Sequence, residues 1–219
     1  MEEGSTRTRR ADAERNRRRL LDAATEMFCE RGLDVGVAEI AQRAGVGRGT
    51  LFRNFPTKEQ LIAAIVVDRM SESVARGRAA LESSDPGEAL FWLLDQAVGL
   101  ALSDRALFAA IGDEYLANEE IRTAHAELLE MLEELVRRAQ AAGAVRDDVS
   151  AVDVLMMLKG VSEVIKSFQH VAPDAAMRQL DLVRAALTPR PGAPPLRGRR
   201  PTVDDLAEAG PVSPNCRPA

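Results

Sequence analysis

Residues 37–58 read VAEIAQRAGVGRGTLFRNFPTK, and this stretch decides the fold of the first part of the chain. Its first half has apolar residues at the spacing of one helix face, at Ile40, Ala41 and Ala44. Gly45 follows where a helix commonly ends in the left-handed conformation, which glycine adopts without a steric penalty. We therefore expect a short helix that ends in a tight glycine turn.

A second helix is predicted directly after this turn. Leu51 and Phe55 lie four residues apart, so one face is apolar, and Pro56 disfavours helical geometry in the residue before it. The other face carries side chains that can reach base edges or phosphates, namely Arg48, Thr50, Arg53 and Asn54. Residues 37–55 thus predict a helix-turn-helix, in which the second helix enters the major groove of DNA.

The sequence around this motif resembles the DNA-binding domain of TetR-family transcriptional regulators. The matching pieces, from Arg17 to about Leu61, are RRRLLDAATEMFCERGL (17–33), EIAQRAGVGRGTLFRNF (39–55) and KEQLI (58–62). The resemblance implies an all-α protein, with an N-terminal three-helix helix-turn-helix domain and a C-terminal helical domain for effector binding and dimerisation. It also implies a ligand-responsive repressor that binds a palindromic operator as a homodimer.

Three positions depart from the family pattern. Val37, Gly47 and Phe52 stand where the family usually has threonine, serine or threonine, and tyrosine. Each missing hydroxyl is expected to clamp phosphate or cap a helix, so we expect backbone N–H groups and basic residues to hold the phosphates instead. Arg48, Thr50, Arg53 and Asn54 are the candidates for reading bases. The candidates for positioning the DNA backbone are Arg17, Arg18, Gly47, Phe52 and Lys58, and Gly49 lets the backbone approach DNA closely.

The charge of the chain is uneven. The whole chain has 29 Lys and Arg against 34 Asp and Glu, a net charge of −5. Residues 7–19 nevertheless hold seven arginines against Asp12 and Glu14. A basic arm ahead of a helix-turn-helix can lie along phosphates or enter the minor groove, whereas the alternative is a solvated arginine-rich tail. We interpret residues 1–14 as a basic flexible arm and residues 15–60 as the DNA-binding domain.

The rest of the chain reads as helices with short connectors. Thr57 and Gln60 form a capping box, and helices are expected from there to the low eighties, over 90–102, 104–111 and 119–142. The last two are expected over 150–170 and 173–187, and by the family resemblance they form the dimer interface. The competing interpretation is that the apolar faces of these two helices close the core of the monomer.

We expect residues 61–188 to form the ligand-binding and dimerisation domain. Polar or adaptable residues on its apolar helices are the candidates for the pocket: Trp92, Gln96, Tyr115, Met156 and Glu163. Each has the alternative of a plain core or solvent-facing residue. The hypothesis for the effector is a small, largely apolar molecule.

Residues 189–219 differ in composition, because eight of the eleven prolines lie there. They are predicted to form a disordered tail.

Other classes of protein find little support in the sequence. No apolar run reaches the roughly 18 residues of a membrane span, and no signal peptide is apparent, so a cytoplasmic location without membrane contact is expected. The stretch GVGRG (45–49) follows a helical segment rather than a strand, which argues against a dinucleotide-binding loop. We expect no enzyme activity, metal or cofactor. A helical-bundle interaction protein with only nonspecific DNA affinity is the alternative to a regulator.

Overall fold

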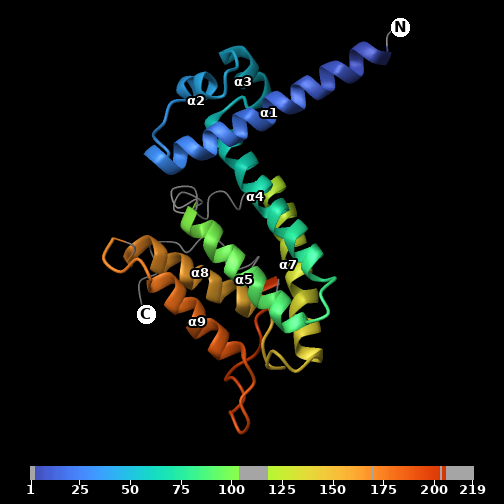
Figure 1. The fold of residues 1–219 in the computed structure, drawn as a ribbon, viewed down its shortest axis with the longest axis vertical. Coiled ribbons are helices and arrows are strands. Elements are labelled where there is room, and N and C mark those ends of the chain that lie inside the picture. Colours follow the sequence, from blue (N-terminus) through green and yellow to red (C-terminus); the bar gives the residue numbers. More distant parts are fainter. Residues whose placement is uncertain (1–2, 104–117, 169, 203, 206–219) are drawn as a thin grey trace.

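The computed structural model describes residues 3–103, 118–168, 170–202 and 204–205. Within these residues the chain is built from α-helices and has no β-strand, as expected for an all-α protein. In chain order the helices are α1 (Glu3–Arg31), α2 (Val37–Arg43), α3 (Arg48–Asn54), α4 (Lys58–Ala80), α5 (Pro86–Ser103), α7 (Glu119–Ala141), α8 (Ala151–Phe168) and α9 (Ala175–Leu187). Helices α1, α2 and α3 gather at one end of the molecule, and α4 leads from them to the group formed by α5, α7, α8 and α9 (Figure 1).

The N-terminal domain is built around one apolar core. Its largest fully buried side chains come from α1, α2, α3 and the residue after α3, and they are Leu20, Phe28, Ile40, Leu51 and Phe55. Leu61 and Ile65 of α4 belong to the same core, and so does Ile121 from the first turn of α7. The three-helix domain is therefore joined to the C-terminal domain through side chains of two helices.

A second core holds the C-terminal domain together. Helices α5, α7, α8 and α9 bury Leu90, Leu94, Leu135, Val154 and Leu187 in it. The second half of α4 packs along α7, and a Cβ on Gly77 would stand 2.0 Å from the sulfur of Met131. The Met131 side chain of α7 thus lies directly against the Gly77 backbone of α4, and a side chain at Gly77 would displace it. No helix of the described residues is long and apolar enough to cross a membrane.

Capping residues set the helix boundaries. The predicted capping box is confirmed, because Thr57 Oγ1 accepts from the Gln60 N–H at 3.2 Å and Gln60 Oε1 accepts from the Thr57 N–H at 3.3 Å. At the start of α8, Asp153 Oδ2 accepts from the Ser150 N–H at 2.8 Å in the same manner. Helix α7 ends before Gly143, whose φ is 71°. The helix expected over 104–111 lies outside the described residues.

The N-terminal segment differs from the flexible arm that the sequence predicts over residues 1–14. Helix α1 begins at Glu3 and continues unbroken to Arg31. The segment contains no proline, and Asp12 and Arg15 form an ion pair at i, i+3, a spacing that stabilises a helix. The arginines ahead of the helix-turn-helix are therefore carried on a helix, which extends past α2 and α3 (Figure 1).

Over residues 189–202 the proline-rich segment is hydrogen-bonded to the rest of the chain, whereas its composition predicts a disordered tail. Asp148 accepts from the Leu196 N–H at 2.8 Å and from Arg146 Nη2 at 2.7 Å. The same Arg146 nitrogen donates to the Pro194 carbonyl at 3.2 Å. This part of the tail folds back on the connector between α7 and α8, because the backbone groups that its prolines leave without helix partners bond to that connector.

We predict that the anchored tail makes stability depend on pH through Asp148. The hydrogen bonds from Arg146 and then from Leu196 lower the pKa of Asp148 to about 2, against about 3.9 for an unfolded aspartate. A carboxylate with a lowered pKa stabilises the fold above pH ~4, and this contribution is lost as the pH falls toward 2. Urea unfolding at pH 7 and pH 3 should therefore show a smaller acid-induced loss of stability in Asp148→Asn than in the wild type.

Asp147→Asn is the matched control for this measurement. Arg200 donates to the backbone carbonyl of Asp147, which the substitution leaves in place. The variant should lose as much stability in acid as the wild type. An Asp148→Asn variant with an unchanged acid response would contradict the anchoring role.

Candidate DNA-binding site

The turn between α2 and α3 has the geometry that the sequence predicts. Gly45 adopts a φ of 64°, and its N–H donates to the Gln42 carbonyl at 3.1 Å. The Val46 N–H donates to the Ala41 carbonyl at 3.0 Å. This pair of bonds is a Schellman motif, which satisfies the last carbonyls of α2 and reverses the chain direction. Helix α3 therefore starts in a direction fixed by backbone bonds.

Two side chains attach α3 to the domain. Leu51 and Phe55, predicted as its apolar face, are 1% and 2% exposed. Phe55 is also the C-cap of α3, with an extended φ of −138° before Pro56. Gly47 precedes α3 in the N-cap position, with an extended backbone and no side-chain cap. With one face buried in this manner, the opposite face of α3 points away from the core.

The outward face of α3 carries the predicted base-reading residues. Arg48, Gly49, Phe52 and Arg53 are exposed. Arg53 Nε donates to the Gly49 carbonyl at 3.0 Å, and its Nη2 lies 3.3 Å from Thr50 Oγ1. Asn54 Nδ2 donates to the Thr50 carbonyl at 2.7 Å, so this half-buried amide is bonded to its own helix. A Cβ on Gly49 would meet no protein atom within 4 Å, so Gly49 is not needed for packing inside the protein.

Two basic residues pack against the aromatic core beside α3. The Arg17 guanidinium carbon lies 4.7 Å from the ring centroid of Phe55. Lys58 Nζ lies 5.9 Å from the ring centroid of Phe28 and donates to the Leu33 carbonyl. An ammonium has three donors, so the bond to Leu33 leaves Lys58 with capacity for a phosphate.

Arg18 lies apart from the residues with which it was predicted. Its guanidinium bonds to carboxylates of α1 and α4 rather than facing the exposed side of α3. Consecutive residues on a helix point about 100° apart, so Arg17 and Arg18 cannot share one face. Arg19 was missed: a Cβ on Gly45 would stand 2.6 Å from its Nη2, which places Arg19 over the turn before α3. The helical period of α1, counted from buried Leu20, could have shown that Arg17, Arg18 and Arg19 point in different directions.

Sequence profiles of known families match both domains. The profile of bacterial regulatory proteins of the TetR family matches residues 20–65. The profile of the C-terminal domain of SbtR-like transcriptional regulators matches residues 85–189. A crystal structure of the TetR transcription regulatory protein from Mycobacterium vanbaalenii is 35% identical, with a TM-score of 0.64 over 82% of this chain and 99% of that one. The chain belongs to the TetR family.

Other relatives agree with this assignment. The crystal structure of the TetR transcriptional regulator SCO0520 from Streptomyces coelicolor is 31% identical, with a TM-score of 0.63 over 79% of this chain and 98% of that one. The HTH-type transcriptional regulator UidR of Escherichia coli is 28% identical over 147 residues, which are 64% of this chain and 74% of UidR. This TetR-family chain is thus a DNA-binding transcriptional regulator and not an enzyme.

The structure separates the residues predicted for the ligand pocket. Trp92 is 44% exposed and Met156 is 54% exposed, and Glu163 is exposed as well. Only Gln96 is half-buried, and Tyr115 lies outside the described residues. Trp92, Met156 and Glu163 thus lie on the surface of the single chain, and their role in ligand binding stays a prediction. The buried face of α5 follows Leu90, Leu94 and Val98, and Trp92 lies on the opposite side of the helix although its neighbours in sequence are apolar.

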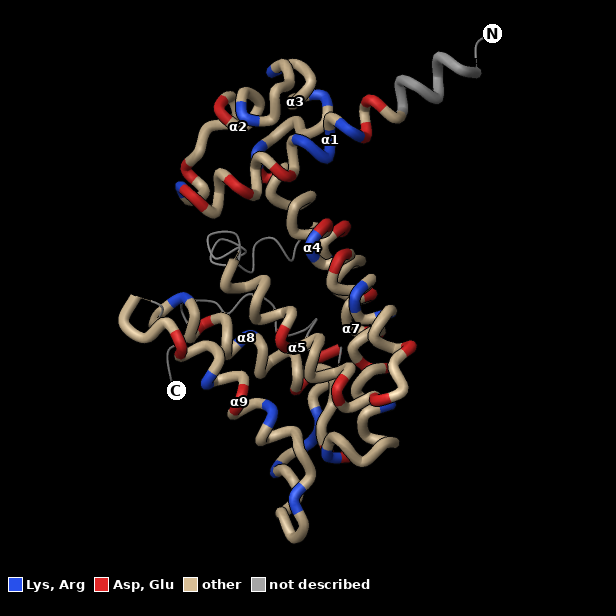
Figure 2. The backbone as a smooth tube through the Cα atoms, in the orientation of Figure 1, with Lys and Arg blue, Asp and Glu red and all other residues tan. Residues whose placement is uncertain are grey.

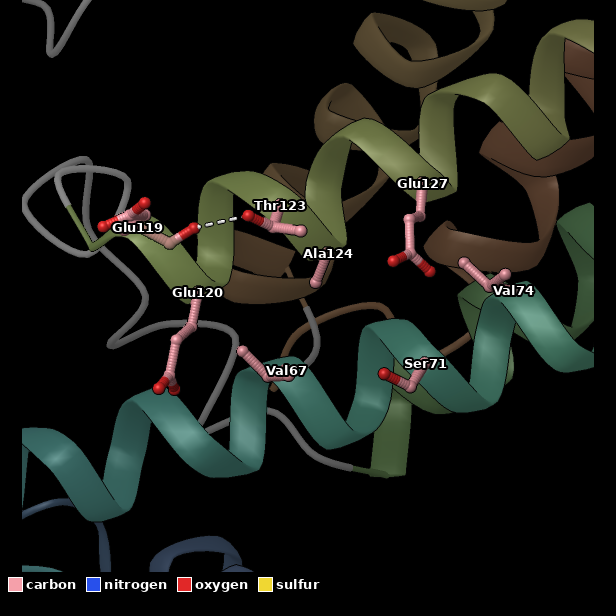
Figure 3. Close-up of a pocket in the computed structure, with 8 residues that line it drawn as sticks. All are labelled: Val67, Ser71, Val74, Glu119, Glu120, Thr123, Ala124 and Glu127. Carbon is pink, nitrogen blue, oxygen red and sulfur yellow. Dashed lines mark hydrogen bonds between the residues drawn. The ribbon is translucent and has the colours of Figure 1, made fainter.

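One hollow among the described residues lies elsewhere, between α4 and α7. It is an open groove of about 400 Å³, with Val67, Ser71 and Val74 on α4 facing Glu119, Glu120, Thr123, Ala124 and Glu127 on α7 (Figure 3). Thr123 Oγ1 donates to the Glu119 carbonyl at 3.0 Å. Three glutamates at its edge make this groove acidic, unlike the apolar pocket that the sequence suggested, and none of the predicted pocket residues lines it.

We predict that a hydroxyl restored at Gly47 stabilises α3. The backbone at Gly47 already has N-cap geometry, and a Cβ there would meet no atom within 4 Å. A serine side chain can therefore accept from an N–H of the first turn, whereas an alanine cannot. Serine and alanine at an N-cap differ by about 1 kcal/mol. Thermal unfolding of the full-length protein should rank Gly47→Ser above the wild type and the wild type above Gly47→Ala; equal midpoints for the two variants would contradict this role of the position.

Proposed function

We propose that this TetR-family protein is a ligand-responsive repressor that acts in the cytoplasm and binds a roughly palindromic operator as a homodimer. The outward face of α3 carries the proposal, because a fixed turn presents exposed Arg48 and Arg53 beside two further basic residues, Arg17 and Lys58. This arrangement matches a recognition helix that reads base edges while flanking groups hold phosphates. A helical-bundle interaction protein with nonspecific DNA affinity gives no reason for such a face.

The outer faces of α8 and α9 support a homodimer. One face of α9 closes the monomer core through Leu180, Val183 and Leu187, whereas Met177 and Leu182 are about half exposed on the same helix. On α8, Met156 is exposed, and a Cβ on the neighbouring Gly160 would meet nothing within 4 Å. Two helices that expose large apolar side chains beside a glycine can pack closely against a second copy.

The effector in this proposal is small and largely apolar, and the C-terminal domain holds it. The core of α5, α7, α8 and α9 supplies apolar surroundings, and the half-buried Gln96 on α5 supplies a polar group for orientation. Such a ligand reduces operator binding only by as much as it prefers the conformation that cannot bind DNA.

Selection from a random pool of duplex DNA tests the proposed function. Full-length protein is used at near-physiological salt without added ligand. An enriched inverted repeat is expected, since two α3 helices of a dimer read half-sites about one helical turn apart. Enrichment of no sequence, with binding that depends on salt alone, would contradict the proposal and favour the helical-bundle alternative.

We predict that Arg48 and Lys58 contribute in different ways. Arg48→Ala should relax the preference at one base step of the enriched sequence and weaken binding by ~1–3 kcal/mol. Lys58→Ala should weaken binding to all duplexes alike, and the slope of log K against log salt should become shallower by about 0.9. Titration of a labelled duplex at several salt concentrations measures both effects.

Arg43→Ala is the matched control for these two variants. Arg43 ends α2 and pairs with Glu26 at 3.1 Å and Glu30 at 3.3 Å on α1. Its removal should change neither specificity nor the salt slope. Equal losses on all sequences from Arg48→Ala and Lys58→Ala would show that the two roles are assigned wrongly.

We also predict that Leu182→Glu dissociates the dimer. A glutamate on the outer face of α9 would be buried without a partner between two copies, which is strongly unfavourable. Sedimentation velocity should show a wild-type dimer and a dissociation constant raised at least about tenfold in the variant.

Leu196→Glu is the control, because Leu196 is equally exposed but lies in the tail segment. It should remain dimeric. A dimeric Leu182→Glu variant would place the interface on another surface.

A further inference from the structure

The guanidinium of Arg18 is the centre of an ion cluster that joins α1 to α4. Its Nη1 lies 3.0 Å from both carboxylate oxygens of Asp68, and its Nη2 lies 3.5 Å from Glu72 Oε1. Its Nε lies 2.9 Å from Asp22, one turn further along α1. Each of the three guanidinium nitrogens thus meets a different carboxylate, and hydrogen bonds between charged groups are stronger than those between neutral groups.

The cluster extends along α4 and contains both basic and acidic residues. Glu72 also pairs with Arg69 at 3.0 Å and with Arg76 at 3.8 Å. Figure 2 shows that basic and acidic residues lie close together along α4. Charges of opposite sign so close together add little to the long-range attraction of DNA, so we look to the position of the cluster in the fold for its role.

That place is the joint between the two domains. Leu61 and Ile65 bury the start of α4 in the N-terminal core, while Gly77 lies against α7. Asp68 and Glu72 lie between these two points, where α4 leaves the N-terminal domain. Any tilt of that domain relative to α4 has to change the distance between Arg18 and these carboxylates.

We propose that Arg18 is a positioning residue of the regulator, which clasps α1 to α4 and so sets the orientation of α3 relative to the C-terminal domain without touching DNA. The side chains of Arg18, Asp68 and Glu72 are 48%, 28% and 30% exposed. Ion pairs of such exposure contribute little to the stability of a fold, but they can bias two arrangements of similar free energy. The proposal rests on DNA binding by this chain, and it replaces the expectation that Arg18 contacts phosphate.

Removal of the Asp68 carboxylate distinguishes a clasp between α1 and α4 from a phosphate contact, because the two roles predict opposite changes in DNA affinity. If Arg18 clasps α4, Asp68→Asn and Arg18→Gln each weaken binding by about threefold to tenfold, and the double variant is no weaker than the single ones. If Arg18 contacts phosphate, Asp68→Asn frees the guanidinium, removes a negative charge and strengthens binding. Asp22→Asn is the matched control, because it removes a carboxylate partner of Arg18 within α1 and leaves the bond between the helices; it should bind as the wild type does.

The binding probe is the labelled duplex pool that the wild-type protein enriches. The salt slope provides a second reading, since loss of a phosphate contact reduces it by about 0.9 and loss of the clasp does not. Stronger binding by Asp68→Asn, or additive effects in the double variant, would overturn the proposal. Unchanged melting temperatures are expected for all variants. Arg18→Lys keeps the charge but has one nitrogen in place of three, so its DNA affinity should fall between those of the wild type and Arg18→Gln.

A distance measurement separates failure of this proposal from failure of the proposed function. Spin labels are placed at exposed Gln42 on α2 and Glu130 on α7, and both native cysteines are replaced by serine. The distance between the labels changes with the angle between the domains and is measured without DNA. Labelled protein is diluted with unlabelled protein, so that distances within one chain are measured. The distribution should broaden in Arg18→Gln and Asp68→Asn but not in Asp22→Asn. Identical distributions in all variants would overturn the clasp, even if no operator is enriched.

Discussion

Helix α4 connects the two hydrophobic cores, and this connection constrains the rest of the molecule. Its first turns complete the core beneath the helix-turn-helix, while its second half packs on α7, where the Met131 side chain of the C-terminal core lies against Gly77. Ile121 of α7 reaches back into the N-terminal core. Because an α-helix is stiff over this length, the position of α3 is tied to the packing of the C-terminal domain.

The parts of the fold that local chemistry determines could be predicted from the sequence. The positive φ of Gly45, the capping box at Thr57 and the two anchors of α3 all follow from residues a few positions apart. The tail could not be predicted, because its order depends on Asp148, which is distant in sequence. Composition reports whether a segment can bury apolar area, and it does not report a hydrogen bond to another part of the chain.

In the candidate site, too, only the features that depend on local sequence could be predicted. Arg48 and Arg53 follow from the period of a single helix, whereas Arg18 and Trp92 depend on which face of α1 or α5 the neighbouring helices cover. An arginine-rich run such as RRR at 17–19 looks uniform as a sequence. In the structure its three members face Phe55, the carboxylates of α4 and the turn at Gly45. Adjacent like charges on a helix therefore have different partners, and net charge alone assigns none of them.

The close contact at Gly77 also gives α4 the properties of a lever. Met131 packs against α4 at Gly77, and Lys58, the first residue of α4, lies 19 positions away, about 28 Å along the axis. A tilt of about 5° around that point would displace the start of α4 by about 2.5 Å, which is more than the rise of one residue in a helix, about 1.5 Å. In the proposed homodimer, a displacement of this size in each subunit would exceed what hydrogen bonds to base edges tolerate. A small repacking beside Met131 would then be enough to bring the two recognition helices of that dimer out of register with the DNA grooves.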